Sequence, residues 1–291
     1  MPSSLTQKNG KGRANLIELK LAHSPDSDDA FMFYALATRK IPTGNLQFTH
    51  VLQDIQTLNE KASQEVYDIT AVSFHAYAYL SDRYCLLPCG ASFGERYGPL
   101  VVARNSFGRT ELKGKRIAVP GRMTTAFLTL QLFEREFIPI FAPFDQVMAR
   151  VTAGEADAAL VIHEGQLTYA RAGLSKVLDL GEWWHQESGL PLPLGGNAIR
   201  RALDPEILRR VPELMRASIQ YGLHHREEAL LYAMQFARGL DTPTADQFVS
   251  MYVNEWTLDY GERGRRAVQS LLDRGFEKGI LPRRVTAEFV E

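Results

Sequence analysis

The sequence is poor in cysteine: its 291 residues include two, Cys85 and Cys89. One C-x₃-C pair without a second Cys or His pair close by is a weak zinc signal. A disulfide is unusual in the cytosol, and a chain of this length does not need one. We therefore expect two free thiols, buried or half-buried, that pack as small apolar side chains.

The sequence also lacks an excess of charge of either sign and any long apolar run. Lys and Arg number 33 and Asp and Glu 34, so the net charge is −1. Such a chain has no global field that recruits nucleic acid or an anionic membrane. Its longest apolar stretches, such as 99–103 and 158–162, are far shorter than the ~20 residues of a spanning helix. We expect a small-molecule ligand and neither a nucleic-acid nor a membrane partner, and the oligomeric state stays open.

Residues 1–14 are polar and lack the apolar segment of a secretory signal. We expect them to form a disordered leader and the protein to be cytoplasmic. The composition, 45% hydrophobic and 23% charged, is that of an ordinary globular protein. A chain of 291 residues is long enough for two domains or one large one.

After this leader, short apolar runs alternate with helical periodicity. The pattern predicts strands at 17–22, 46–52, 67–73, 84–90, 116–119, 139–144, 159–162 and 177–180, with helices between most of them. The apolar segments 98–103 and 191–199 are interpreted as two crossings between lobes, and helical periodicity dominates from 204 onward. The sequence therefore predicts an α/β protein with a two-lobed, periplasmic-binding-protein type 2-like fold and a C-terminal helical segment. Residues 15–103 and 200–291 are assigned to the first lobe, and 104–199 to an inserted second lobe.

Hydroxyl side chains follow several of the expected strands. Ser24 follows the first strand, Ser73 ends the third, and Thr124 and Thr125 open the helix after 116–119. The carboxyl ends of strands in open α/β sheets face the ligand crevice. A helix N-terminus adds unpaired N–H groups and about half a positive charge, which favour an anion. These residues predict a site for a small carboxylate or phosphate, although each hydroxyl can equally cap its helix.

His163 stands where the apolar run 159–162 ends. That run suits a strand buried on both faces of a parallel sheet. We expect burial to lower the pKa of His163 and to keep a neutral imidazole that accepts a proton. Glu164 can orient the ring or face water, and the histidine can also be merely structural. His75, close after Ser73, can face the same cleft.

The loop after the first strand is acidic, with Asp26, Asp28 and Asp29. It lacks the alternating oxygen ligands, the glycine and the terminal glutamate of a calcium loop. We interpret the three carboxylates as caps and favourable dipole partners of the following helix. The site is therefore expected to hold no metal.

Several segments, in this order, resemble the 1,4-dihydroxy-6-naphthoate synthases of the futalosine route to menaquinone. They are Ser24-Pro25-x-x-Asp28-Asp29, Asp54-x-x-Thr57-Leu58-Asn59, Gly98-Pro99-Leu100-Val101-Val102-Ala103-Arg104, Val119-Pro120-Gly121-Arg122-x-Thr124-Thr125-Ala126 and Ile162-His163-Glu164. The resemblance implies a cytoplasmic enzyme that cleaves a carbon–carbon bond of cyclic dehypoxanthinyl futalosine and leaves an aromatic dihydroxynaphthoate. It implies no metal or organic cofactor. His163 falls on the family's proposed base, and the substrate contacts fall on Ala71, Val72, Ser73, Thr124 and Thr125.

The first loop departs from the family's frequent Ser-Pro-Cys-Pro-Asn-Asp-Thr at Asp26, Ser27, Asp28 and Ala30. Two other functions fit the same pattern. A non-catalytic module that binds a small anionic solute needs the same fold, cleft and donors. Chorismate dehydratase of the same pathway resembles this chain in fold, but its opening differs from Ser24-Pro25-x-x-Asp28-Asp29.

Overall fold

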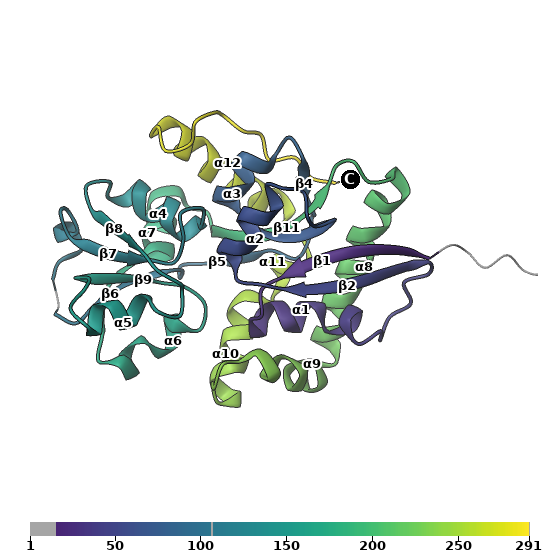
Figure 1. Cartoon of the computed structure of the whole chain (residues 1–291), viewed down its shortest axis with the longest axis horizontal. Helices are drawn as coiled ribbons and strands as arrows, with labels where there is room; N and C mark the ends of the chain where they lie inside the picture. Colours follow the sequence, from purple (N-terminus) through teal and green to yellow (C-terminus); the bar gives the residue numbers. More distant parts are fainter. Residues whose placement is uncertain (1–15, 106, 291) are drawn as a thin grey trace, which may run out of the picture.

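The computed structural model describes residues 16–105 and 107–290, so the expected leader at 1–14 lies outside the described residues. Within them the strands form two sheets, and each sheet is the centre of one lobe (Figure 1). The first sheet has the order β2-β1-β3-β11-β4, with β5 paired to β11, and the second has the order β10-β6-β9-β7-β8. The predicted two-lobed α/β architecture is confirmed.

The first lobe begins with βα units. Its strands are β1 (Ile17–His23), β2 (Leu46–Leu52), β3 (Ile69–Ser73), β4 (Tyr84–Leu86), β5 (Ser92–Gly94) and β11 (Leu192–Arg200). Helices α1 (Ser27–Ala37), α2 (Ile55–Ala62) and α3 (Phe74–Leu80) follow β1, β2 and β3. Strand β1 is parallel to β2 and β3, whereas β11 is antiparallel to β3, β4 and β5. The carboxyl ends of β1 and β3 therefore lie at one edge of the sheet.

The second lobe repeats this arrangement. Its strands are β6 (Leu100–Ala103), β7 (Arg116–Val119), β8 (Ile138–Phe141), β9 (Ala158–Val161) and β10 (Ser175–Asp179). The short helix η1 (Arg109–Glu111) follows β6, and the others are α4 (Thr125–Phe133), α5 (Val147–Thr152), α6 (Gly165–Thr168), η2 (Tyr169–Ala172) and α7 (Leu180–Ser188). All four residues of β9 are buried, as predicted, but the sheet is mixed. Strand β9 is parallel to β7 and antiparallel to β6.

Two segments that the sequence analysis interprets as crossings are strands. Residues 100–103, assigned above to the first lobe, form β6 of the second sheet, and 192–199, assigned to the second lobe, belong to β11 of the first sheet. An apolar extended segment fits the interior of either sheet, where strands are buried on both faces, so only the pairing shows where it belongs. We propose that the second lobe runs from about 99 to 191.

The C-terminal helical segment is confirmed. It consists of α8 (Pro205–His224), α9 (Arg226–Ala233), η3 (Met234–Phe236), α10 (Thr242–Tyr252), α11 (Glu255–Leu258) and α12 (Gly261–Glu277), which pack mainly on the first lobe (Figure 1). Helix α8 begins with Pro205 after the Asp204 cap and buries one apolar stripe, Ile207, Val211, Met215 and Ile219. No helix among the described residues is both long and apolar enough to cross a membrane.

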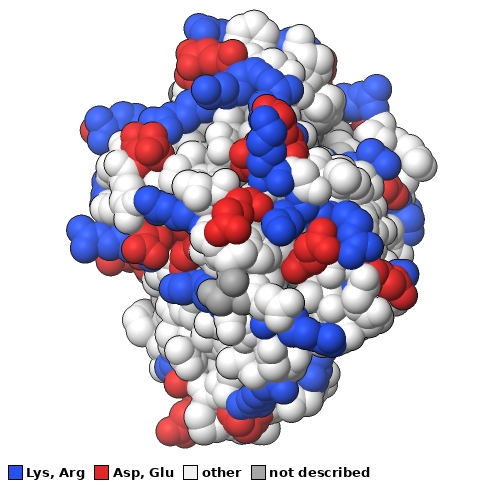
Figure 2. Space-filling model, turned by 90° about the vertical axis from the view of Figure 1, so that its left-hand side faces the viewer, with Lys and Arg blue, Asp and Glu red and all other residues white. Residues whose placement is uncertain are grey.

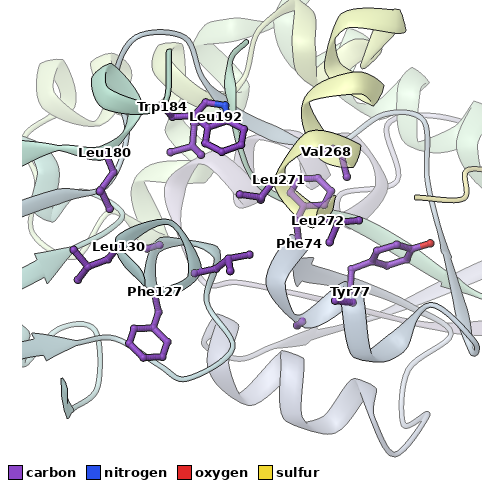
Figure 3. Packing of buried hydrophobic residues seen from close by; sticks show 14 of the residues in the cluster. Phe74, Tyr77, Phe127, Leu130, Leu180, Trp184, Leu192, Val268, Leu271 and Leu272 are labelled. Carbon is purple, nitrogen blue, oxygen red and sulfur yellow. The ribbon is translucent and has the colours of Figure 1, made fainter. Parts of the chain in front are cut away.

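One apolar core runs through both lobes (Figure 3). Phe74 and Leu271 come from the first lobe and its C-terminal helices, and Leu130 and Trp184 come from the second lobe. The Trp184 Nε1–H donates to the carbonyl of Pro191 over 3.0 Å, so the buried indole is satisfied. The two cysteines are free and buried, as expected. Because the core is continuous, the two lobes are held against each other by apolar packing.

The outer surface of the second lobe mixes charges of both signs. Figure 2 shows this face, on which basic and acidic side chains are intermingled. A protein that tracks a nucleic-acid backbone presents a stripe or patch of one sign instead. The pattern on this face matches the net charge of −1.

Candidate functional site

A cavity lies where the carboxyl ends of strands from both lobes meet. Together with the open solvent at its mouth, it encloses about 760 Å³. All of the site residues predicted from the sequence line it: Ser24, Ala71, Val72, Ser73, Thr124, Thr125 and His163. Residues far apart in the chain, near the carboxyl ends of different strands, therefore meet in one cavity. Its lining also includes residues that the sequence analysis did not assign to the site, among them Asp28, Gln166, Asn197 and Tyr252.

Ser73 presents a hydroxyl whose position is set by Asn59 of α2. The Ser73 backbone N–H donates to Asn59 Oδ1 over 3.0 Å, and Asn59 Nδ2 donates to Ser73 Oγ over 3.1 Å. Since Ser73 Oγ accepts this bond and makes no side-chain cap on α3, its own hydrogen is left for a ligand. Asn59 is fully buried and was not predicted as a site residue.

The two threonines at the start of α4 have different roles. Thr124 Oγ1 donates to the Gly121 carbonyl over 3.0 Å and accepts the Phe127 N–H over 3.2 Å, so its side chain serves as the helix cap. Thr125 Oγ1 accepts the His75 N–H over 3.4 Å and keeps its hydrogen for the cavity. The first N–H groups of α4 have no carbonyl partner within the helix. Thr125 and these backbone donors make this end of the cavity suitable for an anion.

His75 lies beneath the start of α4 and is not part of the cavity lining. Its Nδ1 lies 3.2 Å from the Thr124 carbonyl oxygen, and the residue is buried. Burial lowers the pKa of His75 to about 4, so the ring is neutral and Nδ1–H donates to that carbonyl. His75 therefore supports the loop before α4 from below.

His163 directs its ring toward the first lobe from a strained backbone. Its φ is +53°, in the left-handed region, which is uncommon for a residue other than glycine. Its Nδ1 lies 2.9 Å from Asp26 Oδ2, and the Phe144 ring packs edge-on at 5.1 Å between centroids. Strain of this kind persists only where the surroundings determine the conformation, and it clusters at functional sites. His163 Nε2 has no hydrogen-bond partner among residues 16–105 and 107–290.

Asp26 is the centre of a network that joins the two lobes. Its carboxylate is 1% exposed, accepts the Ser24 hydroxyl over 2.5 Å, and pairs with Arg238 over 2.6 Å. Arg238 also pairs with Glu164 over 3.0 Å. Asp26, which the sequence predicts to be a cap, makes no side-chain cap hydrogen bond to α1, because its oxygens are used by His163, Ser24 and Arg238.

The pKa of His163 is raised, whereas the sequence predicts a lowered pKa and a neutral ring. Burial lowers its pKa, as predicted, but the charge and hydrogen bond of Asp26, together with the charges of Glu164 and Asp28, raise the pKa to about 9. For Asp26, burial raises the pKa, whereas His163 and then Arg238 lower it to about 2. The prediction of a neutral imidazole is therefore wrong, because it omitted a carboxylate from the other lobe. At neutral pH the pair is an imidazolium and a carboxylate.

The other two aspartates of the loop hold their protons more tightly. Burial and then the charge of Asp26 raise the pKa of Asp28 to about 7, and burial and then Asp28 raise the pKa of Asp29 well above its usual range. Asp29 Oδ2 accepts the Ser24 N–H over 2.8 Å. Among the described residues, no three His, Cys, Asp or Glu side chains are placed to hold a metal ion.

Comparison with known proteins is consistent with this geometry. A family model described as "Menaquinone biosynthesis" matches residues 19–277. The chain is 41% identical over 262 residues to a 1,4-dihydroxy-6-naphtoate synthase of Thermus thermophilus, covering 90% of this chain and 95% of that protein. It is 37% identical over 270 residues to the enzyme of the same name from Streptomyces coelicolor, covering 91% of this chain and 95% of that protein.

Solved structures support the fold. A crystallised protein of Archaeoglobus fulgidus is 48% identical, with a TM-score of 0.87 over 90% of this chain and 98% of that chain. An alkanesulfonate-binding protein of Xanthomonas axonopodis has a TM-score of 0.73 over 94% of this chain and 98% of that chain. At 14% identity, that likeness shows the fold alone, which is the periplasmic-binding-protein-like fold expected from the sequence. From the family match and the two relatives above 30% identity, the chain belongs to the menaquinone biosynthesis family.

Proposed function

We propose that this protein is a 1,4-dihydroxy-6-naphthoate synthase, a cytoplasmic carbon–carbon lyase that acts on cyclic dehypoxanthinyl futalosine. The observation that carries the proposal is the pairing of His163 with Asp26 in the same cavity as Ser73 and Thr125. The names of two relatives, each covered over 95% of its length, support the choice of reaction.

In this proposal the hydroxyl end of the cavity holds the substrate carboxylate. Ser73, Thr125 and the first N–H groups of α4 donate to its oxygens, and the positive end of α4 stabilises its charge. The substrate ring then extends toward His163. This arrangement orients the substrate before any bond changes, which is itself a large part of catalysis.

His163 acts as the base once its Nε2 proton has left. Asp26 keeps the remaining proton on Nδ1, so the lone pair of Nε2 is the acceptor, as in other carboxylate–histidine pairs. When Nε2 takes a proton from a substrate hydroxyl, the released electron pair forms a carbonyl and the adjacent carbon–carbon bond breaks. The electrons of that bond pass into the ring, and its aromatisation favours the products. A positioned base contributes typically ~10²–10⁴-fold in rate.

The two alternative functions can be separated by one experiment. A solute-binding module would not need an imidazole tied to a buried carboxylate, so that pair favours an enzyme. Purified protein is incubated with cyclic dehypoxanthinyl futalosine and, separately, with chorismate, and the products are identified by mass. We expect dihydroxynaphthoate from the first and no change in the second. Conversion of chorismate, or no turnover of either compound, would overturn the proposal.

Thr125→Val should raise KM by about tenfold with little change in kcat, because it removes one hydrogen bond to a charged group and keeps the shape of the side chain. Steady-state kinetics measure both constants. Thr129→Val is the matched control, since Thr129 is buried one turn later and bonds the Thr125 carbonyl outside the cavity. Equal values of KM in the parent and Thr125→Val would remove Thr125 from the carboxylate site.

A further inference from the structure

Two buried oxygen atoms of the cavity residues lack hydrogen-bond partners. Asp28 is 7% exposed and Asn197 1% exposed, and both line the cavity. Neither Asp28 Oδ1 nor Asn197 Oδ1 has a hydrogen-bond partner among the described residues. A buried polar atom left without a partner is destabilising, and a native protein keeps one for a reason.

The orientation of the Asn197 amide shows whether its unpartnered atom is a hydrogen-bond donor or an acceptor. Its Nδ2 donates to the Gly90 carbonyl over 2.7 Å, and turning the amide over would place oxygen against oxygen. The unpartnered atom is therefore the acceptor. Asp28 Oδ1 is also an acceptor whenever the carboxyl is ionised. Both atoms call for a ligand that brings O–H or N–H donors, and a ligand carboxylate cannot satisfy either.

Asp28 lies at the end of the cavity that holds the base. The charges of His163 and Asp26 both act on it, and its own charge acts on Tyr252, whose hydroxyl donates to Gln166 over 2.8 Å. The carboxylate donors Ser73 and Thr125 are held by other residues, Ser73 by Asn59 and Thr125 by the His75 N–H. The cavity lining thus offers hydroxyl donors from Ser73 and Thr125 and an acidic acceptor from Asp28.

We propose that Asp28 Oδ1 accepts a hydrogen bond from a sugar-derived hydroxyl of the substrate, and so selects a hydroxylated ligand beside His163. This inference rests on the proposed function, which supplies such a substrate. The product, 1,4-dihydroxy-6-naphthoate, is formed after carbon–carbon cleavage and no longer carries the sugar-derived part. Asp28 should therefore distinguish substrate from product, whereas the carboxylate end should bind both.

The test compares Asp28→Leu, which removes the acceptor, with Asp28→Asn, which keeps Oδ1. Titration calorimetry measures the Kd of cyclic dehypoxanthinyl futalosine and of 1,4-dihydroxy-6-naphthoate for both variants and the parent. We expect Asp28→Leu to weaken substrate binding at least tenfold and product binding less than twofold. Asp28→Asn should keep substrate binding within about threefold.

The outcomes separate the subsite from the proposed function. Equal weakening of both ligands by Asp28→Leu, or of neither, would overturn the role of Asp28 even if the parent turns over the substrate. A parent that binds the substrate but does not convert it would overturn the proposed function and leave the subsite supported if the two variants differ as stated. A parent that binds neither ligand would overturn both. Thermal melting at pH 8 checks that each variant is folded.

Discussion

Replacing His163 with alanine should lower kcat by about 10²–10⁴-fold while the substrate Kd stays within a few fold. His163 Nε2 is the free nitrogen of the Asp26-paired ring, and alanine removes the only group that the proposed reaction uses as a base. The carboxylate end of the cavity, with Ser73 and Thr125, is untouched. Steady-state turnover gives kcat, and titration calorimetry gives Kd.

His224→Ala serves as the control, since His224 is exposed near the end of α8 and does not line the cavity. It should turn over substrate at the parent rate.

The pH profile of the parent adds a second check on the role of His163 as the base. Because the pKa of His163 lies at about 9, the neutral form becomes more abundant up to that pH, and kcat/KM should rise with it. A His163→Ala variant as active as the parent, or a profile that is flat from pH 7 to 10, would contradict the role of base.

Asp26→Asn should have the second largest effect. It should lower the free energy of unfolding and shift the pH profile of kcat/KM. The variant leaves the His163 imidazolium without its buried counter-charge and removes one of the two carboxylates that pair with Arg238. Breaking a buried ion pair by removing one partner costs about 3–5 kcal/mol. The pKa of His163 should fall from about 9, so the rise of kcat/KM should move to lower pH. We expect kcat/KM at pH 9 to fall by roughly 10²-fold or more, because the amide no longer holds the ring in position or stabilises its charged form.

The stability difference between parent and Asp26→Asn should itself depend on pH. The folded pKa of His163 is raised from 6.5 to about 9, so its contribution is complete below pH 6.5 and is lost as the pH rises through 9. The folded pKa of Asp26 is lowered from 3.8 to about 2, so its contribution is present above pH 3.8 and is lost as the pH falls through 2. Denaturant unfolding at pH 5 and pH 10 should therefore show the larger difference at pH 5.

Asp246→Asn is the matched control for stability. Asp246 pairs with Arg226 over 2.6 Å, but both side chains are more than one third exposed. Exposed pairs contribute at most about 1 kcal/mol. If Asp26→Asn unfolds like Asp246→Asn and keeps the parent pH profile, the network around Asp26 neither stabilises the fold nor tunes His163.

The site residues found from the sequence share one property: each stands at or just after the carboxyl end of a strand. Ser73 and His163 can be recognised in this way because strand ends are local features, marked by the change from an apolar run to a polar residue. Asn59 and Arg238 carry no such mark. Their roles depend on contacts with residues distant in the chain, and a buried amide or an arginine in a helical region looks ordinary in the sequence.

The acidic loop shows the limit of local reasoning most clearly. Asp26, Asp28 and Asp29 precede a helix, and a local interpretation assigns all three to capping. In the folded chain Asp26 instead binds a histidine of the other lobe, and Asp28 faces the cavity. The same contact contributes most to the reversal of the expected shift of the His163 pKa, because the nearby carboxylates together outweigh burial.

From its own residues the chain determines most of its helices and strands, the α/β class and the edge of each sheet that carries the site, since these follow from periodicity over neighbouring residues. The strand partners of β6 and β11 are decided only when each sheet assembles, and the ionisation of His163 only when the second lobe meets Asp26 of the first. Hydrogen bonding between strands and electrostatic interaction between charges both depend on distance in space. The number of residues that separates two groups along the sequence does not give that distance.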